Sequence, residues 1–330
     1  MTQSMVSDRE IEHAVAALRA GELVAFPTET VYGLGADAAN SKAIRKVFDA
    51  KGRPYDHPLI VHVSDAIQVA NWARSIPAAA HGLARRFWPG PLTLILQRAP
   101  GVNDLVTGGQ DTIALRVPSH PVAQALLRKF GGGIAAPSAN RFGRVSATTA
   151  AHVRSEFGVE VACVLDGGAA DLGIESTIVD LSGSEPALLR PGAVTPAQLE
   201  AALGATLASP GASSPRAPGT LARHYAPRTP LLVLETDLLL ELTATLARDG
   251  KRVAVLARSA ARPVQSNMHW IAAPRAAAEY AHDLYANLRD LDAANCGTIM
   301  VEALPAGDEW TAVRDRLARA AAGAAPAETP

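Results

Sequence analysis

Short apolar runs alternate along the chain with stretches whose apolar residues recur every three or four positions. Each apolar run predicts a buried strand, and each periodic stretch predicts a helix packed on one face. The predicted strands cover 23–26, 59–63, 92–96, 112–117, 134–136, 161–165, 177–181 and 187–189. The predicted helices lie near 11–18, 41–52, 77–88, 122–130 and 147–157, with another opened by Thr195 and Pro196. This alternation indicates an α/β layer structure, mixed in strand direction where short links join strands.

Local signals mark the first two elements. Ser7 and Glu10 have the spacing of a capping box, which predicts a helix start. Pro27 ends the first strand because proline cannot donate to a sheet ladder. Polar residues follow it, and then Gly33 and Gly35, where the backbone can approach a ligand closely. We interpret this stretch as the floor of a pocket, with an ordinary strand-to-loop exit as the alternative.

Composition suggests two domains. Residues 208–218 are rich in proline, glycine, serine and alanine, and such a segment builds no core. A second, smaller α/β domain is predicted beyond it, with strands at 231–234, 253–257 and 298–304 and a helix at 276–291. We therefore expect a first domain at 1–205, a linker at 206–229, and a C-terminal domain at 230–330 that ends in a disordered tail.

Charge and cysteine content exclude several classes of protein. The formal net charge is -1, so RNA binding would need a local basic patch. Cys163 and Cys296 lie far apart in or beside apolar runs, which argues against a disulfide framework or a zinc site and fits a reducing cytoplasm. The N-terminal segment lacks the basic region and apolar core of a secretion signal. No apolar run reaches the roughly 20 residues that span a bilayer, so we expect no membrane association.

Two charged or titratable residues interrupt apolar strands. Arg116 is costly there unless it pairs with an anion, and a buried carboxylate and a bound ligand are equally compatible with the sequence. His62 interrupts another strand, where a satisfied core histidine is the usual reason.

Three polar clusters lie at the ends of predicted elements. Lys51 and Arg53 flank a glycine and suit a phosphate or carboxylate, although cations also favour a helix C-terminus. Residues 137–140 can bind a polar ligand or simply form a turn. A third cluster, 175–177, precedes a strand, with Arg190 beyond it.

Walker A, GxSxG and HExxH motifs are all absent from the sequence, so catalysis by positioning and charge stabilisation, as in nucleotidyl transfer, is favoured.

Taken together, the motifs FPTETVYGLG, Lys51-Gly52-Arg53, FWPGPLTLIL, ALRVPSHP, APSANRFGRVS, ESTIVDL, LLRPG and PGTLARHYAP resemble, in order, the YrdC family of threonylcarbamoyl-AMP synthases, in its longer two-domain form. The resemblance implies a twisted, mostly parallel open sheet with a concave basic cleft, followed by a smaller Rossmann-like domain. It also implies that L-threonine, bicarbonate or CO2, and ATP with Mg2+ give threonylcarbamoyl-AMP and pyrophosphate. The product would serve a transferase that modifies adenosine 37 of tRNAs reading codons that start with A; direct contact with tRNA would be weak.

The resemblance assigns roles to individual residues. Those implied to bind L-threonine are Thr30, His62, Arg116, Ala136 and Ser176. Those implied to bind ATP are Arg53, His57, Thr112, Ser138, Asn140, Ser146, Arg190 and Tyr225, with Lys51 and Arg53 as the catalytic cations. No protein side chain is implied as a ligand of the metal. His57 stands where the family pattern has asparagine, which leaves its contact with ATP open.

Two other functions remain as alternatives. One is a module that binds double-stranded RNA or tRNA without adenylation activity, through a patch such as Arg53, Arg141 and Arg144. The other is a carbamoyltransferase like the related part of hydrogenase maturation proteins, although their zinc-finger and acylphosphatase regions are missing from this sequence. We also expect residues 206–229 to act as a lid that couples the two domains.

Overall fold

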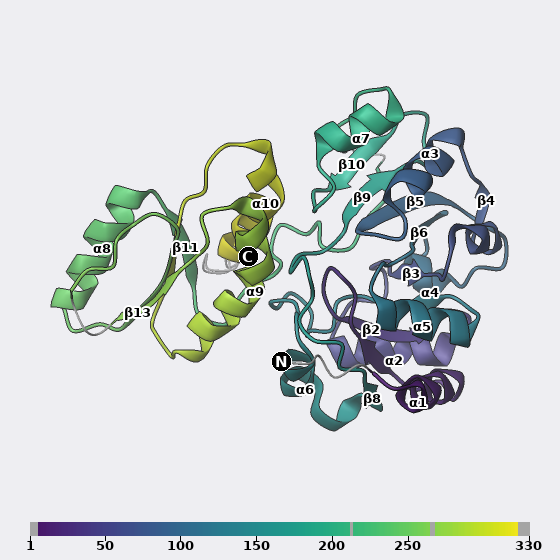
Figure 1. Ribbon diagram of the computed structural model, residues 1–330, viewed down its shortest axis with the longest axis horizontal. Coiled ribbons are helices and arrows are strands. Elements are labelled where there is room, and N and C mark those ends of the chain that lie inside the picture. Colours follow the sequence, from purple (N-terminus) through teal and green to yellow (C-terminus); the bar gives the residue numbers. More distant parts are fainter. Residues whose placement is uncertain (1–5, 212–213, 265–267, 323–330) are drawn as a thin grey trace, which may run out of the picture. The chain divides into compact units, whose positions relative to one another are not determined.

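The computed structural model describes residues 6–211, 214–264 and 268–322. It divides into two compact units, residues 1–142 with 146–220, and residues 143–145 with 221–330 (Figure 1). The residues expected to form a linker, 206–229, therefore contribute to both units. The predicted disordered tail lies largely outside the described residues. Within the described part of the chain, no helix is both long and apolar enough to cross a membrane.

The first unit is one sheet covered by helices (Figure 1). Its strands are β1 (Val24–Phe26), β2 (Gly33–Asp37), β3 (Ile60–His62), β4 (Ala73–Ser75), β5 (Leu92–Arg98), β6 (Thr112–Arg116), β7 (Ile134–Ala135), β8 (Cys163–Val164), β9 (Thr177–Asp180) and β10 (Ala187–Arg190). Its helices are α1 (Asp8–Arg19), α2 (Ser41–Lys51), α3 (Ala78–Phe87), α4 (Asp104–Thr107), α5 (Pro121–Phe130), α6 (Ala150–Phe157) and α7 (Pro196–Leu203), with short 3-10 turns η1 (Ala66–Asn71) and η2 (Gly158–Glu160). The predicted capping box of Ser7 and Glu10 is confirmed at the start of α1.

The sheet runs in the order β10-β9-β5-β6-β3-β7-β2-β1-β8, with β4 paired to β5. The α/β class is confirmed, but the strand directions in this sheet correct the expectation of a mostly parallel one. Among the described strands of this sheet, β1·β8, β3·β6 and β5·β9 pair in parallel and the other pairs are antiparallel. The reason is that short links such as the one between β1 and β2 are too short for a parallel crossover.

The two faces of the sheet carry separate apolar clusters. Alternate residues of β1 face opposite sides, as the two-residue period of a strand requires. Val24 and Phe26 pack with α1 and α5, whereas Ala25 packs on the other face with Ile44 and Phe48 of α2.

The glycines after Pro27 allow close packing between neighbouring strands. Gly33 and Gly35 lie in β2, antiparallel to β1. A Cβ atom at Gly35 would lie 2.8 Å from the Phe26 ring and 2.9 Å from Ile134, and one at Gly33 would lie 3.2 Å from Ala136. The bare backbone thus makes room for the Phe26 ring.

The second unit has a parallel four-stranded sheet in the order β11-β14-β12-β13. Its elements are β11 (Leu231–Leu234), α8 (Thr236–Arg248), β12 (Val253–Ala257), β13 (Met268–Ala272), α9 (Ala277–Ala293), β14 (Ile299–Glu302), η3 (Asp308–Trp310) and α10 (Thr311–Ala321). Residues 143–145 belong here because Ala226 N–H donates to Gly143 O at 2.9 Å and Arg289 donates to Val145 O. The predicted second α/β domain is confirmed.

Candidate active site

Four strand ends meet at one edge of the first sheet. β3 and β6 run in parallel, while β5 runs antiparallel to β6 and parallel to β9. The carboxyl ends of β3 and β6 therefore lie beside the amino ends of β5 and β9. This topology gathers His62, Arg116, Thr93 and Ser176, of which the sequence analysis had proposed all but Thr93.

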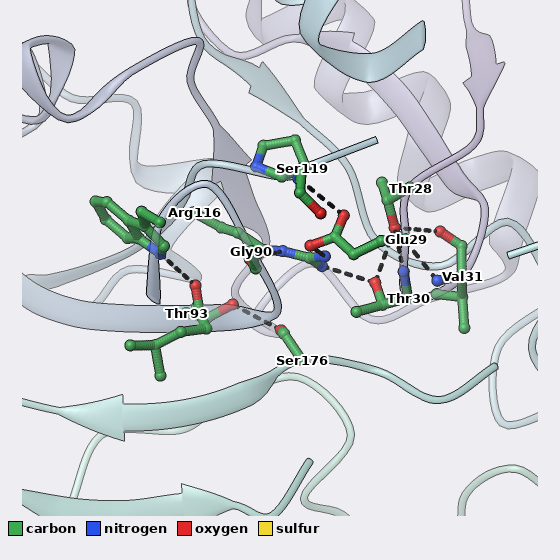
Figure 2. Close-up of polar contacts among 12 residues, drawn as sticks. Thr28, Glu29, Thr30, Val31, Gly90, Thr93, Arg116, Ser119 and Ser176 are labelled. Carbon is green, nitrogen blue, oxygen red and sulfur yellow. Dashed lines mark hydrogen bonds and ion pairs between the residues drawn. The ribbon is translucent and has the colours of Figure 1, made fainter. Parts of the chain in front are cut away.

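Arg116 is the centre of this edge (Figure 2). Its side chain is only 4% exposed and forms an ion pair with Glu29, with 2.8 Å between Nη2 and Oε1. Its Nη1 donates to Thr30 Oγ1 at 2.8 Å, and its Nε donates to Gly90 O at 3.3 Å. The buried carboxylate that the sequence left as one possibility is therefore present, and the guanidinium group combines this ion pair with two donated hydrogen bonds within the protein.

Glu29 stays ionised despite its burial. Burial alone would raise its pKa, but the Arg116 charge and hydrogen bonds, among them the N–H of Ser119 at 3.1 Å from Oε2, hold the pKa below its ordinary value. The pair is thus a buried anion and cation in direct contact.

A chain of hydroxyl groups continues from Arg116 (Figure 2). Thr30 Oγ1 lies 2.8 Å from Thr28 Oγ1, and the Thr28 hydroxyl donates to Val31 O at 2.6 Å. Both threonines are fully buried. The turn between β1 and β2 is therefore fixed by its own side chains.

Ser176 links the residues proposed for threonine to those proposed for the nucleotide. Its Oγ lies 2.7 Å from Thr93 Oγ1 and accepts a hydrogen bond from Arg190 Nη2 at 3.1 Å. Arg190 also donates to Ser176 O at 3.0 Å and to Pro218 O at 2.9 Å. The two predicted halves of the site therefore adjoin here.

His62 lies opposite Arg116 in the β3·β6 register. Burial, reinforced by the Arg116 charge, lowers its pKa to about 3, so the imidazole is neutral at physiological pH. Ala136, just after β7, donates its N–H to Ile60 O at 2.9 Å in the same region. The neutral His62 ring and the Ala136 backbone therefore bring no charge to the candidate site.

Lys51 braces the loop that carries two predicted ATP residues. Its buried Nζ donates to Ser138 O at 2.7 Å and to Asn140 O. Burial, followed by the charge of Arg53, lowers its pKa well below the ordinary value. The partners of this ammonium in the structure are carbonyl groups, which gives Lys51 a structural role that the sequence did not predict.

Arg53 and His57 lie around one aromatic ring. The Arg53 guanidinium carbon is 5.8 Å from the centre of the Phe142 ring, and the His57 ring is 5.2 Å from it, edge to face. Arg53 Nη2 also donates to Pro58 O at 2.8 Å. Burial and then the Arg53 charge lower the pKa of His57, which favours the neutral imidazole.

The remaining predicted residues are less closely gathered. Ser146 Oγ donates to Glu175 Oε1 at 2.6 Å. Thr112 begins β6, four residues before Arg116, so about 13 Å of extended strand separates them. Tyr225 is buried in the second unit, where its ring stacks on that of Tyr285 at 5.8 Å.

Sequence reasoning missed several contributors to this site. Thr93 is a polar residue in an otherwise apolar strand, the same signal that singled out Arg116, and it could have been found that way. The Gly90 carbonyl and the Ser119 N–H are backbone groups, which no side-chain pattern reveals. Among the described residues, no three His, Cys, Asp or Glu side chains gather as a metal site.

Comparison with known proteins identifies the family. Residues 16–192 match the family model of Sua5, YciO and YrdC, described as "Telomere recombination", and residues 194–322 match the model "Threonylcarbamoyl-AMP synthase, C-terminal domain". The chain belongs to the Sua5/YrdC family. The threonylcarbamoyl-AMP synthase of Bacillus subtilis is 41% identical to it over 96% of this chain and 94% of the relative.

Two solved structures of this family share its fold. A double-alanine variant of Pyrococcus abyssi Sua5 superposes with a TM-score of 0.90 at 36% identity, covering 98% of this chain and 95% of that one. The same protein complexed with L-threonine gives 0.89 at 38% identity, with 96% and 95% coverage. The Sua5/YrdC resemblance expected from the sequence motifs is therefore confirmed over both units.

Proposed function

We infer that this protein is a threonylcarbamoyl-AMP synthase, which converts L-threonine, bicarbonate or CO2, and ATP into L-threonylcarbamoyl-AMP and pyrophosphate. The observation that carries this function is the 41% identity to a synthase of that name over nearly the full length of both chains. As an ATP-using nucleotidyltransferase, the enzyme forms a P–O bond at the α-phosphate and releases pyrophosphate.

We propose that Arg116 receives the threonine carboxylate. Arg116 donates two hydrogen bonds, to Thr30 and Gly90, and pairs with Glu29; of its five N–H groups enough remain for the bidentate contact that a carboxylate can make. Thr30, His62, Ala136 and Ser176 would line the same pocket. The complex of the Pyrococcus abyssi relative with L-threonine supports a threonine site in this family.

The nucleotide side is proposed to work through positioning and charge. Arg53 and Arg190 offer guanidinium groups to phosphate oxygens, while His57, Thr112, Ser138, Asn140, Ser146 and Tyr225 are the further contacts expected from the family motifs. Lys51 would act chiefly by holding the loop of Ser138 and Asn140. Mg2+ would enter with ATP, bound by phosphate oxygens as it commonly is in phosphoryl-transfer enzymes.

The reaction then proceeds in two steps. The threonine amine attacks the carbon of CO2, or of bicarbonate with loss of water, and gives a carbamate. A carbamate oxygen attacks the α-phosphorus of ATP, and pyrophosphate leaves. The product is a reactive mixed anhydride, so we propose that a transferase consumes it to modify adenosine 37 of tRNAs that read codons starting with A.

The test is pyrophosphate release from ATP, bicarbonate and Mg2+ with and without L-threonine. We expect release that depends on L-threonine and is much weaker with L-serine. Threonine-independent release, or none, would overturn this function. Salt-sensitive binding of tRNA without any release would instead favour an RNA-binding module.

A further inference from the structure

We propose that Glu29 is the catalytic base that accepts the proton of the threonine ammonium group. This rests on the proposed function, because it takes Arg116 as the partner of the threonine carboxylate. The amine of free threonine is protonated at neutral pH, and a protonated nitrogen has no lone pair to attack carbon. The enzyme therefore needs a proton acceptor at the site.

Glu29 lies where that ammonium must come. In an α-amino acid the nitrogen is bonded to the carbon next to the carboxylate, so a carboxylate on Arg116 brings the ammonium beside the groups around the guanidinium. Of the carboxylates in the described residues, only Glu29 forms an ion pair with Arg116, with Oε1 2.8 Å from Nη2. Figure 2 shows its carboxylate between Arg116 and Ser119.

Binding of the substrate would itself prepare the base. Without substrate, Arg116 stabilises the Glu29 anion, and the Ser119 N–H adds a hydrogen bond. When the threonine carboxylate shares the Arg116 charge, Glu29 loses part of that stabilisation and its proton affinity rises. Glu29 then takes one proton from the ammonium. The substrate carboxylate becomes the anion that pairs with Arg116, so no charge is left alone in the buried site.

The other titratable groups around Glu29 are poorer acceptors. His62 faces Arg116 from β3, and a proton on it would place a second cation beside that guanidinium. His120, at the start of α5, accepts the N–H of Val122 at Nδ1, and its ring also hydrogen-bonds the backbone of Gly167, so it is already engaged within the protein. Arg116 is already protonated. Glu29 is thus the acceptor whose protonation removes a charge rather than adding one.

The step balances without another reactant. The N–H bond breaks, its electron pair stays on nitrogen, and an O–H bond forms on Glu29. The amine lone pair then forms the N–C bond to CO2, and the second N–H proton passes to solvent water as the carbamate forms. Glu29 returns its proton to solvent when the product leaves.

The experiment is the pH profile of kcat for threonine-dependent pyrophosphate release, with the full-length chain and its Glu29→Gln variant. Without the base, only threonine that is already deprotonated reacts. The variant should lose about 10²-fold or more in kcat at pH 7 and recover about tenfold per pH unit as the pH rises. The Asp180→Asn variant, which alters another buried carboxylate on β9, should keep the wild-type profile.

A structural role for Glu29 predicts a different result. A loss of activity that is the same at every pH, or a rise in the threonine KM alone, would overturn the proposal. If Glu29→Gln does not fold, Glu29→Asp decides: a tenfold or greater loss in kcat at unchanged KM supports a base, and a raised KM at unchanged kcat contradicts it. Wild-type release that ignores threonine would instead overturn the proposed function.

Discussion

The buried amino group of Lys51 holds the loop that carries Ser138 and Asn140. Replacing it with methionine keeps the aliphatic stem but removes hydrogen bonds to the carbonyls of Ser138 and Asn140. We expect Lys51→Met to lower the free energy of unfolding by about 1–3 kcal/mol and to raise the KM for ATP. Lys46→Met, on the same helix, removes only an exposed ion pair with Glu22 and should cost under about 1 kcal/mol. Urea unfolding and ATP kinetics measure both, and equal losses would contradict a bracing role.

The Arg116–Glu29 pair allows stability to be separated from function. Arg116→Met leaves a buried carboxylate without its cation and should cost about 3–5 kcal/mol of unfolding free energy. The double variant Arg116→Met with Glu29→Gln removes both charges, so it should recover most of that stability. Threonine-dependent turnover should remain lost in both variants. Chemical denaturation and the pyrophosphate assay test this, and a double variant as unstable as the single one would refute it.

His62 makes stability depend on acid pH. Its pKa is about 3 in the folded protein and near 6.5 when unfolded, so the unfolded chain binds more protons between these values. The stabilisation is fully present above pH 6.5 and falls by at most about 1.4 kcal/mol per unit as pH drops toward 3. His62→Gln should flatten this slope, and exposed His81→Gln should not. Unfolding curves at pH 7 and pH 5 provide the measurement.

At the scale of elements, Gly35 determines how closely β1 and β2 pack. A Cβ atom there would lie 2.8 Å from the Phe26 ring and 3.1 Å from Val24 O. Gly35→Ala should therefore destabilise the first unit by about 1–3 kcal/mol, and Phe26→Leu should relieve part of this clash in the double variant. Gly82→Ala, in open space on α3, should instead stabilise by about 0.5–1 kcal/mol. Thermal unfolding distinguishes the two glycines.

Elements with strong local signals could be predicted from the sequence. The start of α1, helix α2 up to Gly52, and strands β11 and β12 lie where caps and apolar runs placed them. β2 was missed because Gly33 and Gly35 have the composition of a loop, and its strand conformation depends on the Phe26 ring across the sheet. The short strands β4 and β13 were also missed, because neither sequence shows a clear alternation of apolar and polar residues.

The candidate site was predictable only in part. Arg116 and His62 could be found because each interrupts an apolar run. The pairing of Arg116 with Glu29 could not, since it depends on the register of strands far apart in sequence. The hydrogen bonds from Lys51 to the carbonyls of Ser138 and Asn140 could not be predicted either, since they depend on where the chain folds back on α2. Its catalytic role, implied by the family resemblance, stays a prediction.

At the scale of the whole molecule, each unit has a core of its own. Leu83 is fully buried in the first unit, and Leu239 is fully buried in the second. Truncation of either to alanine should cost about 2–5 kcal/mol. We expect each substitution to shift a separate transition in calorimetry. A single transition that both variants shift equally would show that the units unfold together.

Thr28 sets the hydrogen-bonding polarity of Thr30, which lies beside Arg116. The Thr28 hydroxyl donates its one proton to the Val31 carbonyl, so Thr30 is the donor in the hydrogen bond between the two threonine hydroxyls. Thr30 can then offer a ligand only a lone pair, which suits an ammonium or hydroxyl group and repels a second carboxylate. The main-chain oxygen of Val31 thus determines, through Thr28, which ligand groups Thr30 can bind. Thr28→Val would release the Thr30 proton and turn an acceptor into a donor without altering Thr30 itself.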